Sequence, residues 1–249
     1  MLGYTRPEGL TEKNTHYCPG CGHGITHRII AEALGELDML KKAILVAPVG
    51  CAVLATDYLA IDGLQAAHGR APATATGIKR CNPESIVFTY QGDGDLASIG
   101  MAEIIHAAAR GEKITAVFIN NGIYGMTGGQ MAPTTLPGMK TTTSQLGRDV
   151  KVQGYPIRVS ELLSQLDGPA YIERVAVNTP ANVTRAKAAL KKAFQIQQEK
   201  LGFTMVEVVS GCPINWGKTP LDAMKFVGET SLSYYPLGVY KDITAKEGK

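Results

Sequence analysis

Residues 85–121 read "SIVFTYQGDGDLASIGMAEIIHAAARGEKITAVFINN" and carry the clearest structural signal in the chain. An apolar run at 85–90 is followed by a stretch rich in helix formers at 97–109 and by Gly111, a residue typical of a helix end. A second apolar run follows at 114–121. This order predicts a strand, a crossover helix and a parallel strand.

The rest of the chain continues this alternation. Apolar runs predict further buried strands at 43–49, 170–177 and 203–210, and apolar periodicity or helix formers predict helices at 22–37, 73–80, 179–201 and 219–231. We therefore expect an α/β fold with a doubly wound, mainly parallel sheet. Residues 1–249 should form a single domain with an N-terminal cysteine-containing arm and a loosely held C-terminal tail from residue 242. The segment 122–160, rich in Gly, Thr, Pro and Met, is too long for an ordinary connection and predicts a functional loop or lid.

The composition is that of an ordinary globular protein, with 45% hydrophobic residues. Lys and Arg (25) barely exceed Asp and Glu (22), so nucleic acid is not an expected partner. No secretory signal is visible, and no apolar run approaches the ~18 residues needed to cross a membrane. We therefore expect a cytoplasmic protein without membrane contact, in which the five cysteines stay reduced and can bind metal.

Two carboxylates among three glycines come directly after the run at 85–90, and two asparagines end the next run. Asp93 and Asn121 should meet at the carboxyl edge of the sheet, where open parallel sheets bind ligands. Carboxylate, amide and phosphate oxygens suit Mg²⁺, while Gly92 and Gly94 would let phosphate approach the backbone. For "GDG" alone, the plain alternative is a glycine turn before a helix.

Four cysteines form a second candidate site. Cys18 and Cys21 are a C-x-x-C pair in "HYCPGCGHG", whereas Cys51 and Cys212 follow predicted strands singly. Four thiolates suit zinc or an iron–sulfur cluster, and their spread over most of the chain favours a cluster embedded in a large domain. A thioredoxin-like pair would leave Cys51 and Cys212 unexplained. Cys81 is expected to be a plain thiol.

Six motifs together resemble the β subunit of 2-oxoacid:ferredoxin oxidoreductases, the branched-chain 2-oxoisovalerate group in particular. In chain order they read "YCPGCGHG", "VGC", "HGRAPATATGIK", "YQGDGDLASIG", "NNGIYGMTGGQMAPTT" and "GCP". The resemblance covers most of residues 15–220, and its GDG and NN elements are similar to the thiamine diphosphate signature. It implies three cofactors: thiamine diphosphate, Mg²⁺ and a 4Fe-4S cluster.

The resemblance also assigns site residues. It implies that Mg²⁺ is held by Asp93, Asn121 and the carbonyl of Ile123, and the cluster by Cys18, Cys21, Cys51 and Cys212. The residues expected against thiamine diphosphate are Val49, Gly50, Cys51, Ala52, His68, Gly94, Asp95, Gly125 and Met126. Of these, His68 is the candidate catalytic residue, although from its position alone it could instead cap a helix. Asp95 could likewise meet the cofactor's periphery or cap the following helix.

The activity implied is oxidative decarboxylation of a 2-oxoacid to acyl-CoA and CO₂, with electrons passing to ferredoxin. The apolar "CAVLATDYLAI" after Cys51 favours a small aliphatic substrate such as 3-methyl-2-oxobutanoate. The alternatives are the same chemistry on 2-oxoglutarate or pyruvate, a non-redox thiamine diphosphate lyase, and a non-catalytic iron–sulfur electron-transfer module.

The chemistry also needs a glutamate opposite the aminopyrimidine ring of the cofactor. Glu103 and Glu112 fall on or after the helix behind the metal loop, so the motifs found here supply only the diphosphate half of the site. We expect an α subunit to supply the other half, with possible γ and δ ferredoxin-like subunits, and the isolated chain to be inactive.

Overall fold

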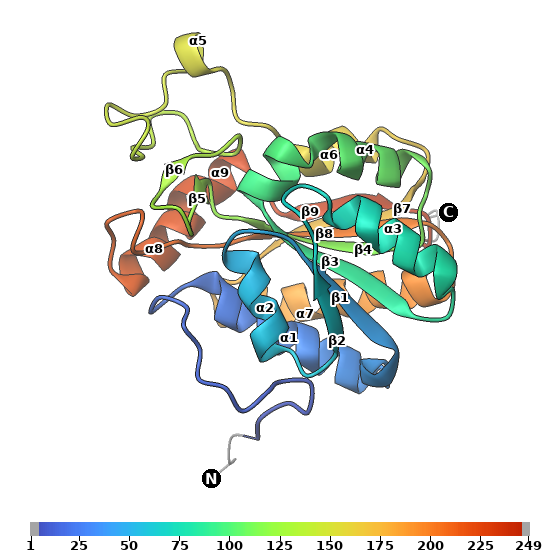
Figure 1. The fold of residues 1–249 in the computed structure, drawn as a ribbon. Helices are drawn as coiled ribbons and strands as arrows, with labels where there is room; N and C mark the ends of the chain where they lie inside the picture. Colours follow the sequence, from blue (N-terminus) through green and yellow to red (C-terminus); the bar gives the residue numbers. More distant parts are fainter. Residues whose placement is uncertain (1–4, 246–249) are drawn as a thin grey trace.

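The computed structural model describes residues 5–245 and is built on a seven-stranded sheet in the order β2-β1-β3-β4-β8-β7-β9 (Figure 1). Neighbouring strands run parallel except β7 and β9. The strands are β1 (Ala43–Ala47), β2 (Asp62–Gln65), β3 (Ile86–Gly92), β4 (Thr115–Asn120), β7 (Pro169–Ala176), β8 (Phe203–Val209) and β9 (Gly238–Asp242). The predicted doubly wound, mainly parallel α/β fold is confirmed.

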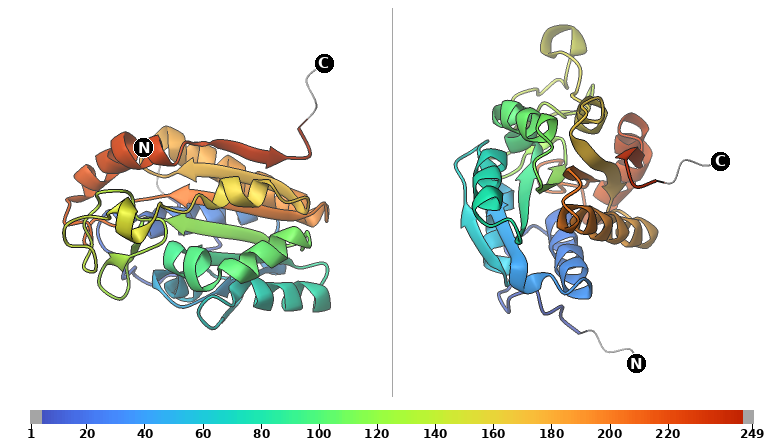
Figure 2. Two further views of the ribbon diagram at one scale, coloured as in Figure 1. Left: turned by 90° about the horizontal axis from the view of Figure 1, so that it is seen from above. Right: turned by 90° about the vertical axis from the view of Figure 1, so that its right-hand side faces the viewer.

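Helices cover both faces of the sheet (Figure 2). One face packs against α1 (Gly22–Glu36) and α7 (Pro180–Gln198), and the other against α3 (Ala71–Cys81), α4 (Met101–Ala109) and α6 (Val159–Ser164). Successive side chains of a strand point to opposite faces, so Leu45 joins the first core and Val46 the second. Among residues 5–245, no helix combines the length and the apolar character needed to span a bilayer.

The shorter elements lie mainly around the carboxyl edge of the sheet and in the long loop after β4. They are η2 (Cys51–Leu54), α2 (Ala55–Tyr58), η3 (Asp95–Ile99), the hairpin of β5 (Ile123–Tyr124) and β6 (Gln130–Met131), α5 (Val150–Gln153), α8 (Pro220–Phe226), η4 (Val227–Ser231) and α9 (Leu232–Tyr234); η1 (Leu40–Lys42) precedes β1.

The helix expected over 97–109 begins differently. The chain first makes the π-helical turn η3, in which the N–H of Gly100 donates to the carbonyl of Asp95 at 2.8 Å, and α4 starts only at Met101. A Cβ at Gly100 would lie 2.9 Å from the carbonyl oxygen of Gly69. The turn at Gly69 therefore packs tightly against the π-helical turn η3, which is wider than an α-helical turn. The predicted helix over 219–231 is likewise divided into α8 and the π-helical turn η4.

Two strands of the seven-stranded sheet were not expected from the sequence, and neither were the short hairpin strands β5 and β6. The four residues of β2 are exposed, so they lack the apolar run used to recognise strands. The strand β9 carries the end of the chain back into the sheet, and its last residue, Asp242, binds Lys192 of α7. The prediction of a loose tail from residue 242 is therefore wrong at its start, and residues 246–249 lie outside the described part of the chain.

Candidate cofactor site

The strands β3 and β4 end side by side, with Gly92 paired to Ile119. The loops that follow them carry Asp93 and Asn121 to the same edge of the sheet, as the sequence predicted. Asp93 and Asn121 are both buried, with 1% and 8% of their surfaces exposed. The edge therefore presents a carboxylate and an amide together.

The carboxylate of Asp93 is fixed from one side. Its Oδ2 accepts the N–H of Gly122 at 2.5 Å, the hydroxyl of Thr134 at 2.7 Å, and the N–H groups of Asn121 and Ile123 at 3.2 Å each. Four donors thus converge on one oxygen. The sequence did not single out Thr134, although it lies within the motif "NNGIYGMTGGQMAPTT", because nothing in the motif shows which side chain reaches Asp93, 41 residues earlier.

The other oxygen, Oδ1, accepts the N–H of Gly94 at 3.0 Å and keeps lone-pair capacity for a cation. Burial raises the pKa of Asp93 to about 6, although the hydrogen bonds from Thr134, Gly122, Gly94 and Asn121 act in the opposite direction. A buried carboxylate held this way is stabilised by a positive charge. These residues therefore fit a divalent ion with a diphosphate.

One pocket of about 110 Å³ collects every residue expected against thiamine diphosphate or Mg²⁺. It is lined by Val49, Gly50, Cys51, Ala52, His68, Asp93, Gly94, Asp95, Asn121, Ile123, Gly125 and Met126. Gly92, expected from the sequence to let phosphate approach, also lines the pocket, whereas the sequence did not assign three further lining residues to it: His23, Tyr124 and Thr127. A pocket that holds a whole cofactor is usually about 300 Å³ or larger, so these residues line part of one.

Asp95 holds His68 instead of capping a helix. The carboxylate of Asp95 is 2% exposed, contacts Nδ1 of His68, and accepts the N–H of Gly69 at 2.5 Å and Nε2 of Gln91 at 2.7 Å. The residue before α3 is Arg70, which makes no side-chain cap, so the helix-cap interpretation of His68 is wrong. Because Nδ1 is engaged by Asp95, Nε2 is the ring nitrogen left to interact with a bound molecule.

The four candidate cluster ligands come from three parts of the chain and meet beside this pocket. Cys21 precedes α1, Cys51 begins η2 and Cys212 follows β8. A Cβ built at Gly125 would lie 3.3 Å from Sγ of Cys51 and 3.7 Å from Sγ of Cys212. Burial, joined by the nearby thiols of Cys212, Cys51 and Cys18, raises the pKa of Cys21 to about 12. The four thiols are therefore mutual neighbours, and all are free.

The four thiols of the described chain do not converge on one point. In the described part of the chain, no three His, Cys, Asp or Glu side chains come together closely enough for a single metal ion. Asn215 lies between the cysteines and the metal loop, since its Nδ2 donates to the carbonyl of Gly125 at 2.9 Å and lies 3.4 Å from Sγ of Cys212. It falls just beyond the "GCP" motif, and its residue type alone did not single it out.

His23 connects the cysteine segment to the core. Its ring stacks on Tyr17 with centroids 4.8 Å apart, and its Nδ1 lies 2.6 Å from the hydroxyl of Tyr90 in β3. Burial lowers the pKa of His23 to about 4, so the ring is neutral at ordinary pH. The hydroxyl of Tyr17 donates to the carbonyl of Cys51 at 2.8 Å, which ties the N-terminal segment to η2.

Comparisons with known proteins identify the family of the chain. Residues 48–208 match the family model for the C-terminal TPP-binding domain of thiamine pyrophosphate enzymes. Ketoisovalerate oxidoreductase subunit VorA of Methanothermobacter thermautotrophicus is 47% identical over 98% of this chain and 51% of the relative. 2-oxoglutarate synthase subunit KorB of Methanocaldococcus jannaschii is 37% identical over 93% of this chain and 82% of the relative.

A solved structure shares the fold. The 2-oxoglutarate:ferredoxin oxidoreductase from Magnetococcus marinus, with 2-oxoglutarate, coenzyme A and succinyl-CoA bound, superposes with a TM-score of 0.78 at 24% identity, covering 99% of this chain and 87% of that chain. This chain spans about half the length of the VorA relatives that it matches. By its sequence relatives and the matched domain, the chain belongs to the thiamine diphosphate-binding subunits of the 2-oxoacid:ferredoxin oxidoreductase family, close to the branched-chain group.

Proposed function

We propose that this chain is the β subunit of an enzyme that oxidatively decarboxylates a 2-oxoacid to acyl-CoA and CO₂ and passes the electrons through a 4Fe-4S cluster to ferredoxin. The observation that carries the proposal is the position of Cys51. Cys51 lines the pocket that contains Asp93 and Asn121, and its thiol lies near those of the other three cysteines. A cofactor that gives up electrons and a group that accepts them would thus be held by adjacent residues.

The metal loop supports Mg²⁺ and a diphosphate. Asp93 would offer Oδ1, Asn121 its side-chain oxygen and Ile123 its carbonyl, a set of oxygen donors that suits this hard ion. Gly92 has open space where a side chain would stand, so a phosphate could approach the backbone there. The N–H groups at the start of η3 add a favourable electrostatic environment for the anion.

The cysteine group supports a cluster over a zinc ion. Tetrahedral zinc would place four sulfurs about 2.3 Å from one point, whereas a 4Fe-4S cluster keeps its cysteine ligands further apart. The four cysteines also come from three separate parts of the chain, as expected for a cluster embedded in a large domain. Gly125 is the residue that leaves room beside Cys51 and Cys212.

When bound, thiamine diphosphate would supply the carbon nucleophile and hold the electrons left by decarboxylation, and the cluster would take them one at a time. The residues of this chain would bind and orient. Asp93 and Asn121 would fix the diphosphate end through Mg²⁺, and Asp95 would keep His68 turned so that Nε2 can donate or accept a proton in the pocket. His23, neutral and clamped by Tyr17 and Tyr90, would form the apolar wall between pocket and cluster.

For the substrate, we propose a branched-chain acid such as 3-methyl-2-oxobutanoate. Val49, Ala52 and Met126 give the pocket apolar lining, and the VorA relatives are ketoisovalerate oxidoreductase subunits. Because the KorB relatives are 2-oxoglutarate synthase subunits, 2-oxoglutarate is the competing candidate substrate. A panel of 2-oxoacids assayed on the complete complex decides between them: a higher kcat/KM for 2-oxoglutarate would contradict the branched-chain assignment.

A second polypeptide should complete the cofactor pocket. The acidic residues that line it are Asp93 and Asp95, and no glutamate of the described chain is among its lining residues. Glu103 binds Arg70 and Glu112 binds Arg80 and Arg110, so both are engaged elsewhere. The glutamate for the aminopyrimidine ring should therefore come from an α subunit, and possible γ and δ subunits should carry electrons onward to ferredoxin.

We propose that the complex is cytoplasmic. Three variants of the complex, purified anaerobically, test both sites. Asp93→Ala should lose Mg²⁺-dependent thiamine diphosphate while keeping the iron, and Cys212→Ala should lose iron while keeping thiamine diphosphate. Cys81→Ala, at an exposed thiol away from the pocket, should keep both. Iron and thiamine diphosphate are measured per chain. A zinc-loaded protein without thiamine diphosphate would overturn the proposal.

A further inference from the structure

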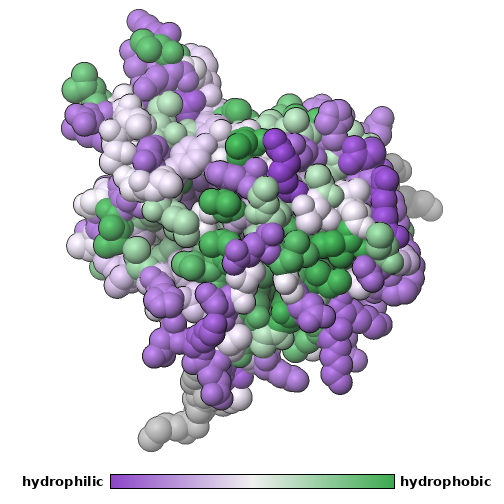
Figure 3. Space-filling view, in the orientation of Figure 1, coloured by the Kyte–Doolittle hydropathy of each residue, from purple (hydrophilic) through white to green (hydrophobic). Residues whose placement is uncertain are grey.

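The long loop after the cofactor site projects beyond the body of the molecule. We define the projecting loop as residues 137–155; it includes α5 and stands clear of the sheet and helices (Figure 1). Its Leu146, Val152 and Tyr155 are 98%, 81% and 73% exposed, the three highest values among the exposed large apolar side chains of residues 5–245. The protrusion carries separate hydrophobic spots among hydrophilic residues (Figure 3). Such clustering on one segment marks an interaction surface.

The projecting loop is ordered from within by Arg148. This side chain is 6% exposed, and its guanidinium donates to the carbonyls of Thr135 at 2.7 Å, Pro133 and Gly154 at 2.9 Å, and Tyr155 at 3.0 Å. The backbone of Arg148 also pairs with Gly138 and Met139 across the base of the loop. A buried guanidinium satisfied by carbonyls fixes the backbone around it. The loop therefore holds its apolar side chains outward in a set arrangement.

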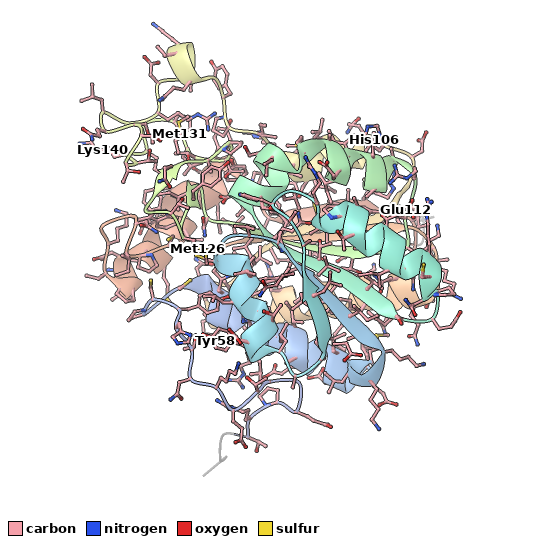
Figure 4. All side chains as sticks on the ribbon, viewed as in Figure 1. Tyr58, His106, Glu112, Met126, Met131 and Lys140 are labelled. Atoms are coloured by element: carbon pink, nitrogen blue, oxygen red, sulfur yellow. The ribbon has the colours of Figure 1, made fainter. Side chains whose placement is uncertain are left out.

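The base of the projecting loop is part of the metal loop. Thr134 donates its hydroxyl to Asp93, and Thr135 donates its own to the carbonyl of Gly122 at 2.6 Å. Arg148 binds the carbonyl of that same Thr135. Met126 of the pocket, Met131 of the hairpin and Lys140 of the loop follow one another along one side of the molecule (Figure 4). A body seated on the loop would thus stand beside the pocket.

We infer that the projecting loop is the docking element for the polypeptide that completes the cofactor pocket, inserting Leu146, Val152 and Tyr155 into an apolar surface of that partner. The inference rests on the proposed function, since the partner is identified by the missing half of the site. A second copy of this chain fits less well, because it would bring another diphosphate half and leave the pocket without its glutamate.

A photo-crosslinking experiment on the complete complex tests the inference. Tyr155 is replaced by the photoreactive residue p-benzoylphenylalanine, which is close to it in shape, and the crosslinked peptide is identified by mass spectrometry. We expect it to come from another polypeptide, one whose co-production lets this chain retain thiamine diphosphate. A crosslink to a second copy of this chain, or none in an intact complex, would overturn the inference.

A triple variant measures how much the three apolar side chains of the projecting loop contribute to association with the partner. Leu146→Asp, Val152→Asp and Tyr155→Asp together should weaken association at least ~100-fold in sedimentation experiments, because apolar anchors dominate interfaces. The control pair Leu201→Asp and Val239→Asp, at apolar residues 42% and 55% exposed outside the loop, should leave association unchanged. Equal weakening by both sets would contradict the inference. If the triple variant did not fold, the crosslink alone would decide.

Association is measured by mass and by crosslinking, without reference to cofactor. A complex that assembles through the loop but holds no thiamine diphosphate would therefore count against the proposed function. A complex that binds thiamine diphosphate and assembles equally well with the triple variant would count against the docking element.

Discussion

The carboxylate of Asp93 should make the stability of the metal-free chain fall as the pH rises. Burial raises its pKa from 3.8 to about 6 in the folded chain. The folded state therefore binds the proton more tightly than the unfolded state does. The stabilisation by this proton is fully present below about pH 4, which is near the unfolded pKa, and is lost as the pH rises through about 6.

The magnitude follows from the difference between the two pKa values. It is about two pH units, and each unit corresponds to about 1.4 kcal/mol, so the charged form of Asp93 costs about 3 kcal/mol of unfolding free energy at neutral pH. Asparagine cannot ionise and keeps one acceptor oxygen. The Asp93→Asn variant should therefore lack this part of the pH dependence.

Urea unfolding of both reduced, metal-free proteins between about pH 4 and pH 7 measures the effect. We expect the unfolding free energy of the variant, relative to that of the wild type, to rise by about 3 kcal/mol over this range. Mg²⁺ with thiamine diphosphate, added to the complex at neutral pH, should stabilise the wild type and not the variant. Parallel pH curves for the two proteins would refute the reasoning that burial dominates at Asp93.

Further substitutions test packing around the site and in the core. Gly94→Ala would place a Cβ 2.3 Å from the ring of Tyr124 and should weaken thiamine diphosphate binding by the complex about 10-fold in calorimetry, with recovery when Tyr124→Ala is added. Gly168→Ala would place a Cβ 2.2 Å from a backbone carbonyl of α4 and should cost about 3 kcal/mol in urea unfolding, whereas Gly24→Ala, in open space on α1, should gain about 1 kcal/mol. Arg174→Met should cost about 3–5 kcal/mol in the same assay, because it leaves a buried carboxylate uncompensated.

The sequence predicts the parts of the fold that local signals control. The parallel strands β1, β3, β4, β7 and β8 are apolar runs. The predicted helix start at residue 179 agrees with the structure, in which the hydroxyl of Thr179 caps α7 by accepting the N–H of Asn182 at 3.2 Å. The site motifs lie on loops that directly follow these strands. Once the strands are parallel, their carboxyl ends must meet at one edge, so the juxtaposition of Asp93 and Asn121 follows from the topology.

Other features depend on contacts between distant segments and leave no local pattern. The hydrogen bond of Thr134 to Asp93, and of Asn215 to the carbonyl of Gly125, each joins loops that the fold alone brings together. The π-helical turn η3 accompanies the packing of the Gly69 turn against it, although residues 97–109 favour an ordinary helix. The strand β9 is half-exposed and antiparallel, and only its position beside β7 makes it a strand.

The two asparagines that end β4 have different roles. Asn120 points into the core, where its Nδ2 donates to Oε1 of Glu207 at 2.8 Å, and Nε of Arg174 lies 2.9 Å from Oε2 of that glutamate. Asn121 lines the cofactor pocket instead. Because successive residues at a strand end face opposite sides, Asn120 anchors the loop to the core while Asn121 presents its amide to the pocket. The buried ion pair thus fixes the strand end from which Asn121 and the N–H groups around Asp93 are held.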